Sequence, residues 1–265
     1  MTLPCLLIIA GSDPSCGAGL QADIRVATAH GCYPTAVTTA LTVQNTTGVS
    51  EVHTLTPDLV AAQAGFVMTD ICPAAIKIGM LGNAEVAEAV LSAVEKAKCD
   101  LGCRNIVVDT ILKSTSGKPL IDDWNSSAFC SLLRAARIIT PNLPEALALA
   151  DTESGTPPEE LATLLSLKFG GVSVYLKGGH AEGNTITDLF FNAEEQHLTA
   201  IQQPRIDTPN THGTGCCLST SLAALLAKGH SLDRAARQAN AFMHRALVNG
   251  RLYKIGHGHG PSFIC

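Results

Sequence analysis

The sequence predicts an α/β fold, a three-layer α/β/α sandwich in which helices cover both faces of a mostly parallel sheet. Short apolar runs typical of buried strands alternate with helical patterns along the whole chain. Hydrophobic residues make up 46% of the 265 residues but aromatic residues only 4%, so we expect an aliphatic core. No low-complexity linker, repeat or break in composition divides the chain. We therefore expect a single domain over residues 1–265.

The elements follow from local signals. The first strand, expected over Leu3–Ala10, is a continuous apolar run that ends at Gly11, typical of a strand buried on both faces. A glycine-containing loop then leads into a helix that ends near His30, before Gly31. Apolar periodicity, prolines in first turns and capping residues predict the others. Further strands are expected over Pro34–Val43, Ala74–Met80, Asn105–Leu112, Arg137–Pro141, Val172–Lys177, Ile186–Phe191 and Gln196–Ile201, and helices over Pro57–Met68, Ala84–Lys98, Trp124–Arg134, Leu143–Ala150, Pro157–Phe169, Cys217–Lys228 and Leu232–Val248.

Charge and cysteine usage narrow the partners. The net charge is −5 and no long basic run occurs, which argues against nucleic acid or an anionic membrane as the main partner. No apolar run approaches the length of a membrane span. The ten cysteines are scattered, and Cys99 and Cys103 lack a second ligand pair at zinc-site spacing. We expect reduced thiols and a cytoplasmic location.

The stretch Asp207–Cys217 is rich in glycine and small hydroxyl residues, and a helical pattern of apolar residues follows it directly. Free backbone N–H groups and the positive end of a helix dipole at such a junction bind anions. Cys216, a residue able to act as a base, lies at the junction itself. The stretch therefore predicts the catalytic corner of a phosphoryl-transfer enzyme.

Charged residues follow several predicted strands, where open α/β sheets bind their ligands. Asp109 and Glu145 at neighbouring strand ends could hold hydrated Mg²⁺, or they could cap a turn and favour a helix dipole. Lys177 could reach a nucleotide phosphate or simply be solvated. His212 could donate to a phosphate or only pack in the loop.

Two glycine patterns have competing interpretations. Gly17–Ala22 fits the dinucleotide pattern G-x-G-x-x-A, but Thr39–Asn45 lacks the carboxylate that such a site needs. A tight turn at a small-substrate pocket is therefore favoured over a nicotinamide site. His257 and His259, separated by glycine, could suggest a metal, but a flexible glycine tail is favoured.

Several motifs occur together in order along nearly the whole chain. They are Ile9–Asp23, Ala40–Thr46, Ile76–Leu81, Thr140–Glu145, Lys177–His180, Asn210–Cys216 and Gly256–Pro261. As a set they resemble the ribokinase-type kinases, specifically the hydroxymethylpyrimidine and phosphomethylpyrimidine kinases of thiamine synthesis. The resemblance implies a ribokinase-like fold, ATP and Mg²⁺ as cofactors, a small pyrimidine substrate, and a homo-oligomer such as a dimer.

The resemblance also implies roles for individual residues. The pyrimidine would be bound by Gly11, Asp23, Gln44 and Met80. Asn142 and Glu145 match the family's N-x-x-E metal motif, and Lys177 its nucleotide contact. From these matches and from the positions of the charged residues described above, we expect the metal at Asp109 and Glu145 and the nucleotide at Asn142, Lys177 and His212. The anion hole would be formed by Gly213, Thr214 and Gly215. Cys216 would be the base, its thiol pKa lowered from about 8.5 at the helix N-terminus.

One departure from the family pattern concerns the second phosphorylation. Thr110 follows Asp109 where similar kinases carry proline, and Thr115 stands where they carry lysine. Lys113 could substitute from two residues earlier. Binding of the pyrimidine monophosphate therefore stays open. Pyridoxal kinase is the nearest rival function, followed by a nicotinamide-dependent oxidoreductase and a non-catalytic pyrimidine sensor.

Overall fold

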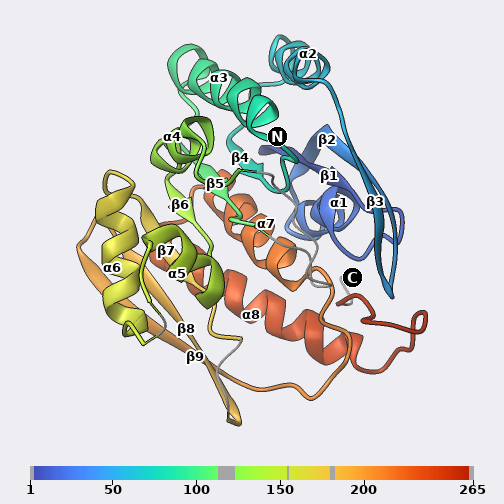
Figure 1. The fold of residues 1–265 in the computed structure, drawn as a ribbon, viewed down its shortest axis with the longest axis vertical. Coiled ribbons are helices and arrows are strands. Elements are labelled where there is room, and N and C mark those ends of the chain that lie inside the picture. The colour runs from blue at the N-terminus through green and yellow to red at the C-terminus, as the bar shows by residue number, and fades with distance from the viewer. Residues whose placement is uncertain (1–2, 113–122, 154, 180–182, 263–265) are drawn as a thin grey trace.

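A computed structural model describes residues 3–112, 123–153, 155–179 and 183–262. In these ranges nine strands form one sheet in the order β3-β2-β1-β4-β5-β6-β7-β8-β9 (Figure 1). The strands are β1 (Cys5–Ser12), β2 (Tyr33–Asn45), β3 (Gly48–Thr54), β4 (Ala75–Ile78), β5 (Ile106–Val108), β6 (Ile138–Ile139), β7 (Ser173–Leu176), β8 (Thr185–Asn192) and β9 (His197–Pro204). The helices are α1 (Gly19–Ala29), α2 (Pro57–Met68), α3 (Ala84–Leu101), α4 (Ser127–Ala135), α5 (Leu143–Ala150), α6 (Pro158–Lys168), α7 (Thr214–Ala227) and α8 (Leu232–Gly250).

The predicted fold class is confirmed. Six neighbouring strands of the sheet pair in parallel, in the order β2, β1, β4, β5, β6 and β7. The remaining strands, β3 at one edge and β8 and β9 at the other, pair antiparallel. Helical crossovers place helices on both faces of the parallel part. The strands therefore end together at one carboxyl edge, where ligands bind in such sheets.

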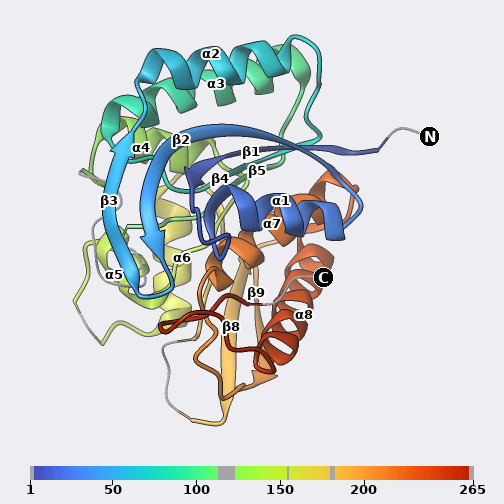
Figure 2. The same ribbon diagram turned by 90° about the vertical axis from the view of Figure 1, so that its right-hand side faces the viewer.

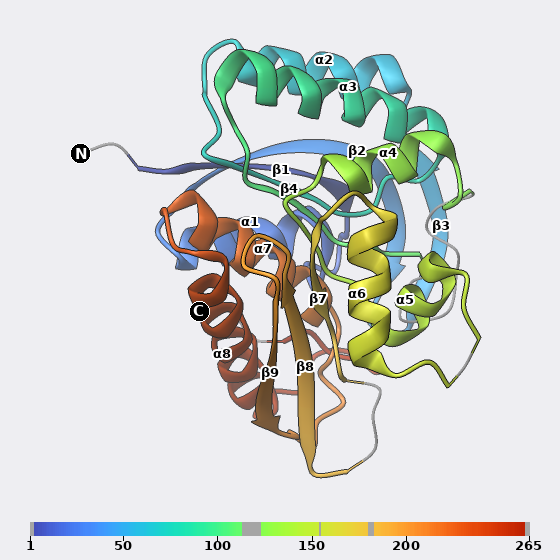
Figure 3. The same cartoon turned by 90° about the vertical axis from the view of Figure 1, so that its left-hand side faces the viewer.

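Two apolar cores separate the three layers. In β1, Leu7 and Ile9 pack with α2 to α6, whereas Leu6 and Ile8 pack with α1, α7 and α8. Figure 2 shows α2 and α3 on one side of β1 with α1 and α7 on the other. Figure 3 shows α6 and α8 on opposite sides of the β8–β9 hairpin. This alternation explains why β1 is apolar from Leu6 to Ala10, since both of its faces are covered there.

Most element boundaries differ from the predictions by a few residues, and four differences have a clear physical reason. β3 was not expected: its polar residues alternate on an edge hairpin with β2. The first turn of α4 starts only after Ser126, whose side chain caps the helix by accepting from Phe129 N–H. β5 ends at Val108, because the chain leaves the sheet at Asp109. α7 begins at Thr214, three residues earlier than predicted, which places Cys216 within the first helical turn. Across the described ranges, none of the helices combines the length and apolar character that crossing a membrane would require.

Candidate active site at the carboxyl edge of the sheet

A buried charged cluster lies where β5, β6 and β7 end. Lys177 Nζ lies 3.1 Å from Asp109 Oδ1 and 3.8 Å from Glu145 Oε2. We call these three residues the carboxyl-edge cluster. Only 1% of the Asp109 side chain, 9% of that of Glu145 and 17% of that of Lys177 are exposed. The structure thus brings these three strand-end residues together.

The three charges of the cluster influence one another's protonation. Burial raises the pKa of Asp109, but Lys177 and Lys77 outweigh burial and leave that pKa below its usual value. Burial, supported by the charge of Asp109, raises the pKa of Glu145 although Lys177 opposes the shift. Burial acts to lower the pKa of Lys177, but the two carboxylates act more strongly in the opposite direction. The pKa of Lys177 is therefore raised above its usual value, and its ammonium stays charged. One ammonium thus faces two carboxylates.

Helix α5 fixes the position of Glu145. Asn142 is its N-cap: the Asn142 side chain accepts from Glu145 N–H, and Glu145 Oε2 accepts from Asn142 N–H, a reciprocal capping box. Thr110 Oγ1 also donates to Glu145 Oε2 at 3.2 Å. The Asn142 side-chain oxygen, which we predicted to contact the nucleotide, therefore caps a helix in this structure.

The N-terminus of α7 lies against the carboxyl-edge cluster. A Cβ atom added to Gly215 would lie 3.4 Å from Lys177 Nζ and 3.6 Å from Asp109 Oδ2. Thr214 N–H donates to Thr211 O, whereas the N–H groups of Gly215 and Cys216 have no backbone acceptor in the described ranges. Two free donors at a helix N-terminus beside a lysine form an anion site. Of the residues predicted for the anion hole, Gly215 has a free N–H group, whereas that of Thr214 is bonded; the free N–H group of Cys216 was not part of the prediction.

The protonation of Cys216 differs from the prediction. Its thiol is buried, with 7% of the residue exposed. Burial raises the pKa of Cys216 to about 12, although Lys77 and a hydrogen bond from Gly19 N–H act to lower it. The expectation of a lowered pKa was wrong, because the desolvation of a thiolate here outweighs the effect of the helix N-terminus. Cys216 is a neutral thiol in the unliganded protein at neutral pH.

A second group of polar side chains lies on the other side of the α7 N-terminus. His212 Nε2 lies 2.8 Å from Asp13 Oδ2 and 3.1 Å from the amide nitrogen of Gln44. Burial acts to raise the pKa of Asp13, but the hydrogen bonds from His212, from Ser15 and from the Ala18 N–H group together have the larger effect. The pKa of Asp13 is therefore lowered to about 2. We call Asp13, Gln44 and His212 the histidine group. His212, predicted as a nucleotide contact, thus lies beside a predicted pyrimidine contact.

Close packing explains the glycines of the first loop. A Cβ atom on Gly17 would lie 2.2 Å from the ring of His212, and one on Gly213 would lie 1.9 Å from Gly17 O. A Cβ atom on Gly11 would lie 3.1 Å from Met80 Sδ, so these two predicted pyrimidine contacts are neighbours. Packing therefore accounts for the G-x-G spacing without a dinucleotide.

Asp23 is placed differently from the other predicted pyrimidine contacts. It is fully buried, with Oδ2 2.6 Å from Lys77 Nζ and Oδ1 2.7 Å from Thr220 Oγ1. Lys77 comes from β4 and Thr220 from α7, so the pair joins three elements beneath the site. In this structure the Asp23 carboxylate is occupied by Lys77 and Thr220.

Several residues of the site were missed by sequence reasoning. Asp13 binds His212, and Lys77 binds Asp23. Thr140 and Ser219 donate hydrogen bonds to Asp109. Lys77 left a usable signal, because a lysine inside the apolar run Ala75–Ile78 needs a buried partner of opposite charge. The residues weighed for the second phosphorylation, Lys113 and Thr115, lie outside the described residues.

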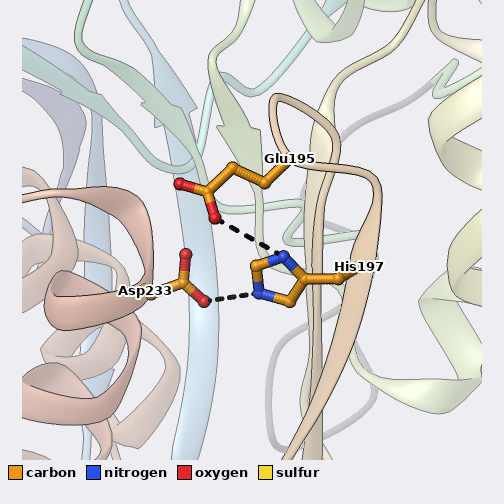
Figure 4. A group of neighbouring side chains, drawn as sticks. All are labelled: Glu195, His197 and Asp233. Atoms are coloured by element: carbon orange, nitrogen blue, oxygen red, sulfur yellow. Dashed lines mark hydrogen bonds and ion pairs between the residues drawn. The ribbon is translucent and has the colours of Figure 1, made fainter.

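Another charged group lies at the opposite edge of the sheet. His197 Nε2 lies 2.8 Å from Asp233 Oδ1, and His197 Nδ1 lies 3.6 Å from Glu195 Oε2 (Figure 4). We call these three residues the amino-edge cluster, because the β8–β9 turn lies beside the start of β7. The three residues are also the group of potential metal ligands found among the described residues. The imidazole of His197 lies between the two carboxylates, and its contacts with both already account for this arrangement, which joins the hairpin to α8.

An anion-binding helix N-terminus, a lysine and two carboxylates at the carboxyl edge of a parallel sheet define an α/β phosphotransferase. The model of the phosphomethylpyrimidine kinase family matches residues 13–262. The chain therefore belongs to this family. It is 40% identical over 261 residues to the hydroxymethylpyrimidine/phosphomethylpyrimidine kinase of Escherichia coli (strain K12), covering 96% of this chain and 95% of that protein. It is also 40% identical to the thiamine biosynthetic bifunctional enzyme TH1 of Arabidopsis thaliana, covering 98% of this chain and 49% of that protein.

Solved structures agree with the fold. The pyridoxal kinase of Staphylococcus aureus, in complex with AMP-PCP and pyridoxal, superposes with a TM-score of 0.86 at 29% identity, covering 99% of this chain and 93% of that one. A phosphomethylpyrimidine kinase from Clostridium difficile 630 superposes with a TM-score of 0.74 at 30% identity, covering 93% of this chain and 100% of that one. The fold is thus shared by pyridoxal kinases and phosphomethylpyrimidine kinases. The match to the family model and the sequence identities assign this chain to the phosphomethylpyrimidine kinase family.

Proposed function

We propose that this protein transfers the γ-phosphoryl group of ATP to the hydroxymethyl oxygen of 4-amino-5-hydroxymethyl-2-methylpyrimidine or to its monophosphate, in thiamine biosynthesis. The observation that carries the proposal is the position of the α7 N-terminus. Its free N–H groups lie between the carboxyl-edge cluster and the histidine group. A phosphoryl group held there has a site for Mg·ATP on one side and one for a polar ring on the other.

The carboxyl-edge cluster suits a magnesium ion. Its donors are carboxylate and hydroxyl oxygens, which Mg²⁺ prefers, and few protein ligands are needed because the ion keeps several waters. Two carboxylates share the single ammonium of Lys177, and burial raises the pKa of Glu145, so added positive charge would stabilise the pair. Asp109 and Glu145 would hold the ion, which would supply positive charge against the charge that develops on the transferred phosphoryl group.

Lys177 marks the nucleotide side. A pocket of about 190 Å³ opens beside it and is lined mainly by apolar side chains, with Gly178 providing backbone. Its lining residues are Leu143, Pro158, Glu159, Leu176, Lys177, Gly178, Thr187 and Leu189. An apolar pocket next to an ammonium suits a nucleotide whose base is buried and whose phosphates reach Lys177.

The histidine group marks the pyrimidine side. Asp13 can only accept, so His212 Nε2 carries the proton that it donates to Asp13. That nitrogen then has no lone pair for Gln44, whose amide N–H groups are available to the substrate ring. Gly11 and Met80 would contact the ring nearby. Asp23 would act on the ring only if its pairing with Lys77 changed on binding.

The role of Cys216 is tested by substitution. As the base, it would need to lose a proton despite a pKa of about 12 in the unliganded protein. We expect Cys216→Ala to lose most turnover while still binding ATP, measured by steady-state kinetics and calorimetry. Wild-type kcat in Cys216→Ala would assign this position a backbone N–H role only. Loss of ATP binding would instead indicate a disturbed anion site.

Pyridoxal kinase remains the second candidate, favoured by the TM-score of 0.86 to the Staphylococcus aureus enzyme. The decisive experiment is a coupled ADP-release assay with the pyrimidine, its monophosphate and pyridoxal in parallel. We expect kcat/KM to be highest for a pyrimidine. A clear preference for pyridoxal would contradict the proposal, and turnover of the monophosphate would establish the second phosphorylation. A single kinase domain over 1–265, a cytoplasmic location and a homodimer complete the proposal.

A further inference from the structure

The C-terminal segment, residues 256–262, is packed into the fold, so the expectation of a flexible glycine tail was wrong. Gly258 N–H donates to Thr46 Oγ1 at 3.3 Å. A Cβ atom added to Gly256 would lie 2.1 Å from Thr46 Oγ1, and one added to Gly258 would lie 2.0 Å from Thr46 O. Thr46 lies in the turn that joins β2 to β3, two residues after Gln44. The alternating glycines thus let the segment lie directly against the hairpin that carries Gln44.

The same segment holds the backbone of His212 on both sides. His212 N–H donates to Gly260 O at 3.1 Å, and Ser262 N–H donates to His212 O at 3.3 Å. His212 and Pro261 thereby form a parallel bridge. A Cβ atom on Gly260 would lie 2.1 Å from Asn210 Oδ1. The loop before α7 and the C-terminal segment are therefore packed as one unit.

Asn210 anchors this unit to the end of α8. Its side-chain nitrogen donates to Gly250 O and to Tyr253 O, at 2.7 Å each. Asn210 is 5% exposed and its oxygen is the atom that Gly260 approaches. Because the amide is held by two bonds, it cannot turn away to accommodate a larger residue at position 260. The position of the segment is thus fixed from the protein interior.

We infer that the C-terminal segment is a positioning element for the acceptor substrate, with Gly258 and Gly260 as its critical residues. It contacts the two elements that supply Gln44 and His212, and it sets the distance between them. Within the described residues, its hydrogen bonds and close contacts are to this side of the site and to the region that Asn210 anchors, not to Lys177 or Asp109. The inference rests on the proposed function, and it predicts an effect on the pyrimidine that spares ATP.

The test compares two glycine-to-alanine variants. Gly258→Ala introduces a methyl group against the backbone of Thr46, whereas Gly65→Ala places one in open space on α2. Neither glycine has a positive φ, so backbone strain does not separate them. We expect Gly258→Ala to raise KM for the pyrimidine about tenfold or more with KM for ATP unchanged, because a displaced contact weakens acceptor binding. Gly65→Ala should match the wild type in both constants.

Two further measurements, the change in Tm on ligand binding and amide hydrogen exchange, distinguish weaker pyrimidine binding from a folding defect. The pyrimidine should raise the Tm of the wild type more than that of Gly258→Ala, while Mg·ATP raises both equally. In the wild type, the pyrimidine alone should slow exchange of the His212 and Ser262 amides. Equal pyrimidine KM in both variants, parallel loss of ATP binding, or unchanged exchange would overturn the inference. Absence of any pyrimidine turnover in the wild type would instead contradict the proposed function.

Discussion

The carboxyl-edge and amino-edge clusters each combine two carboxylates with one cationic or basic group, yet they differ in burial. In the first, no side chain is more than 17% exposed, whereas in the second Glu195 is 64% and His197 39% exposed. Water screens the exposed cluster, so its attraction contributes little to stability. The buried cluster retains an excess negative charge that water cannot screen. Burial therefore distinguishes the cluster to which we assign a role in phosphoryl transfer from the one that joins two elements.

The largest expected effect concerns the Lys77–Asp23 pair beneath the carboxyl-edge cluster. Both side chains are 0% exposed. Lys77→Met leaves an uncompensated buried carboxylate, and we expect it to lower the free energy of unfolding by about 3–5 kcal/mol. Urea denaturation measures the change. As a control, Lys77→Met combined with Asp23→Leu should recover much of the loss, and a double variant as unstable as the single one would contradict the role of the pair.

The second prediction separates the clusters by activity. Asp109→Asn removes a charge that would hold Mg²⁺ beside Lys177, and we expect kcat to fall on the order of 10²- to 10³-fold, as for other losses of preorganised charge stabilisation. Asp233→Asn in the amino-edge cluster is the matched substitution and should leave kcat unchanged. Steady-state kinetics at several Mg²⁺ concentrations measure both. Equal losses in the two variants would remove the distinction between the clusters.

A third prediction concerns a partly buried histidine, His30, that has no carboxylate partner among the described residues. His30 lies 4.4 Å from the Phe242 ring and its Nε2 lies 2.7 Å from Ser221 Oγ. Burial, then the charges of Lys228 and Arg245, lower its pKa to about 4. Its native pKa lies below the unfolded value of about 6.5, so its contribution to stability is present above that pH and is lost as pH falls toward 4.

The Tm of the wild type should therefore fall more between pH 7 and pH 4.5 than that of His30→Gln, which retains polar atoms but cannot become protonated. Differential scanning fluorimetry across this pH range measures the difference. Parallel curves for the two proteins would show that His30 does not titrate with folding.

The smallest effect is expected at the amino edge. His197→Ala breaks the ion pairs with Glu195 and Asp233, and we expect a loss of at most about 1 kcal/mol because the cluster is partly exposed. Urea denaturation should show this small change with kcat unaltered. A loss as large as that of Lys77→Met would mean that exposure does not govern these pairs.

Local pattern alone determined the order of the elements other than β3, and the residues that follow the central strands. The alternation of apolar strands and helices predicted the parallel sheet, and because parallel strands end at one edge, the residues that follow them, Asp109, Glu145 and Lys177, were candidates for a ligand site. The glycine-rich start of α7 was visible for the same reason, since capping and helix propensity act over a few residues. These features depend on neighbours in the sequence.

Only the tertiary structure decided the protonation of Cys216 and the position of His212. The pKa of Cys216 depends on how completely other elements exclude water, and that desolvation outweighs the local helix terminus. His212 meets Asp13 and Gln44, which lie 199 and 168 residues away in sequence. The packing of Gly258 against Thr46, 212 residues apart, is likewise a property of the assembled fold. Sequence specified which groups are present, while burial and long-range packing specified their charge and their partners.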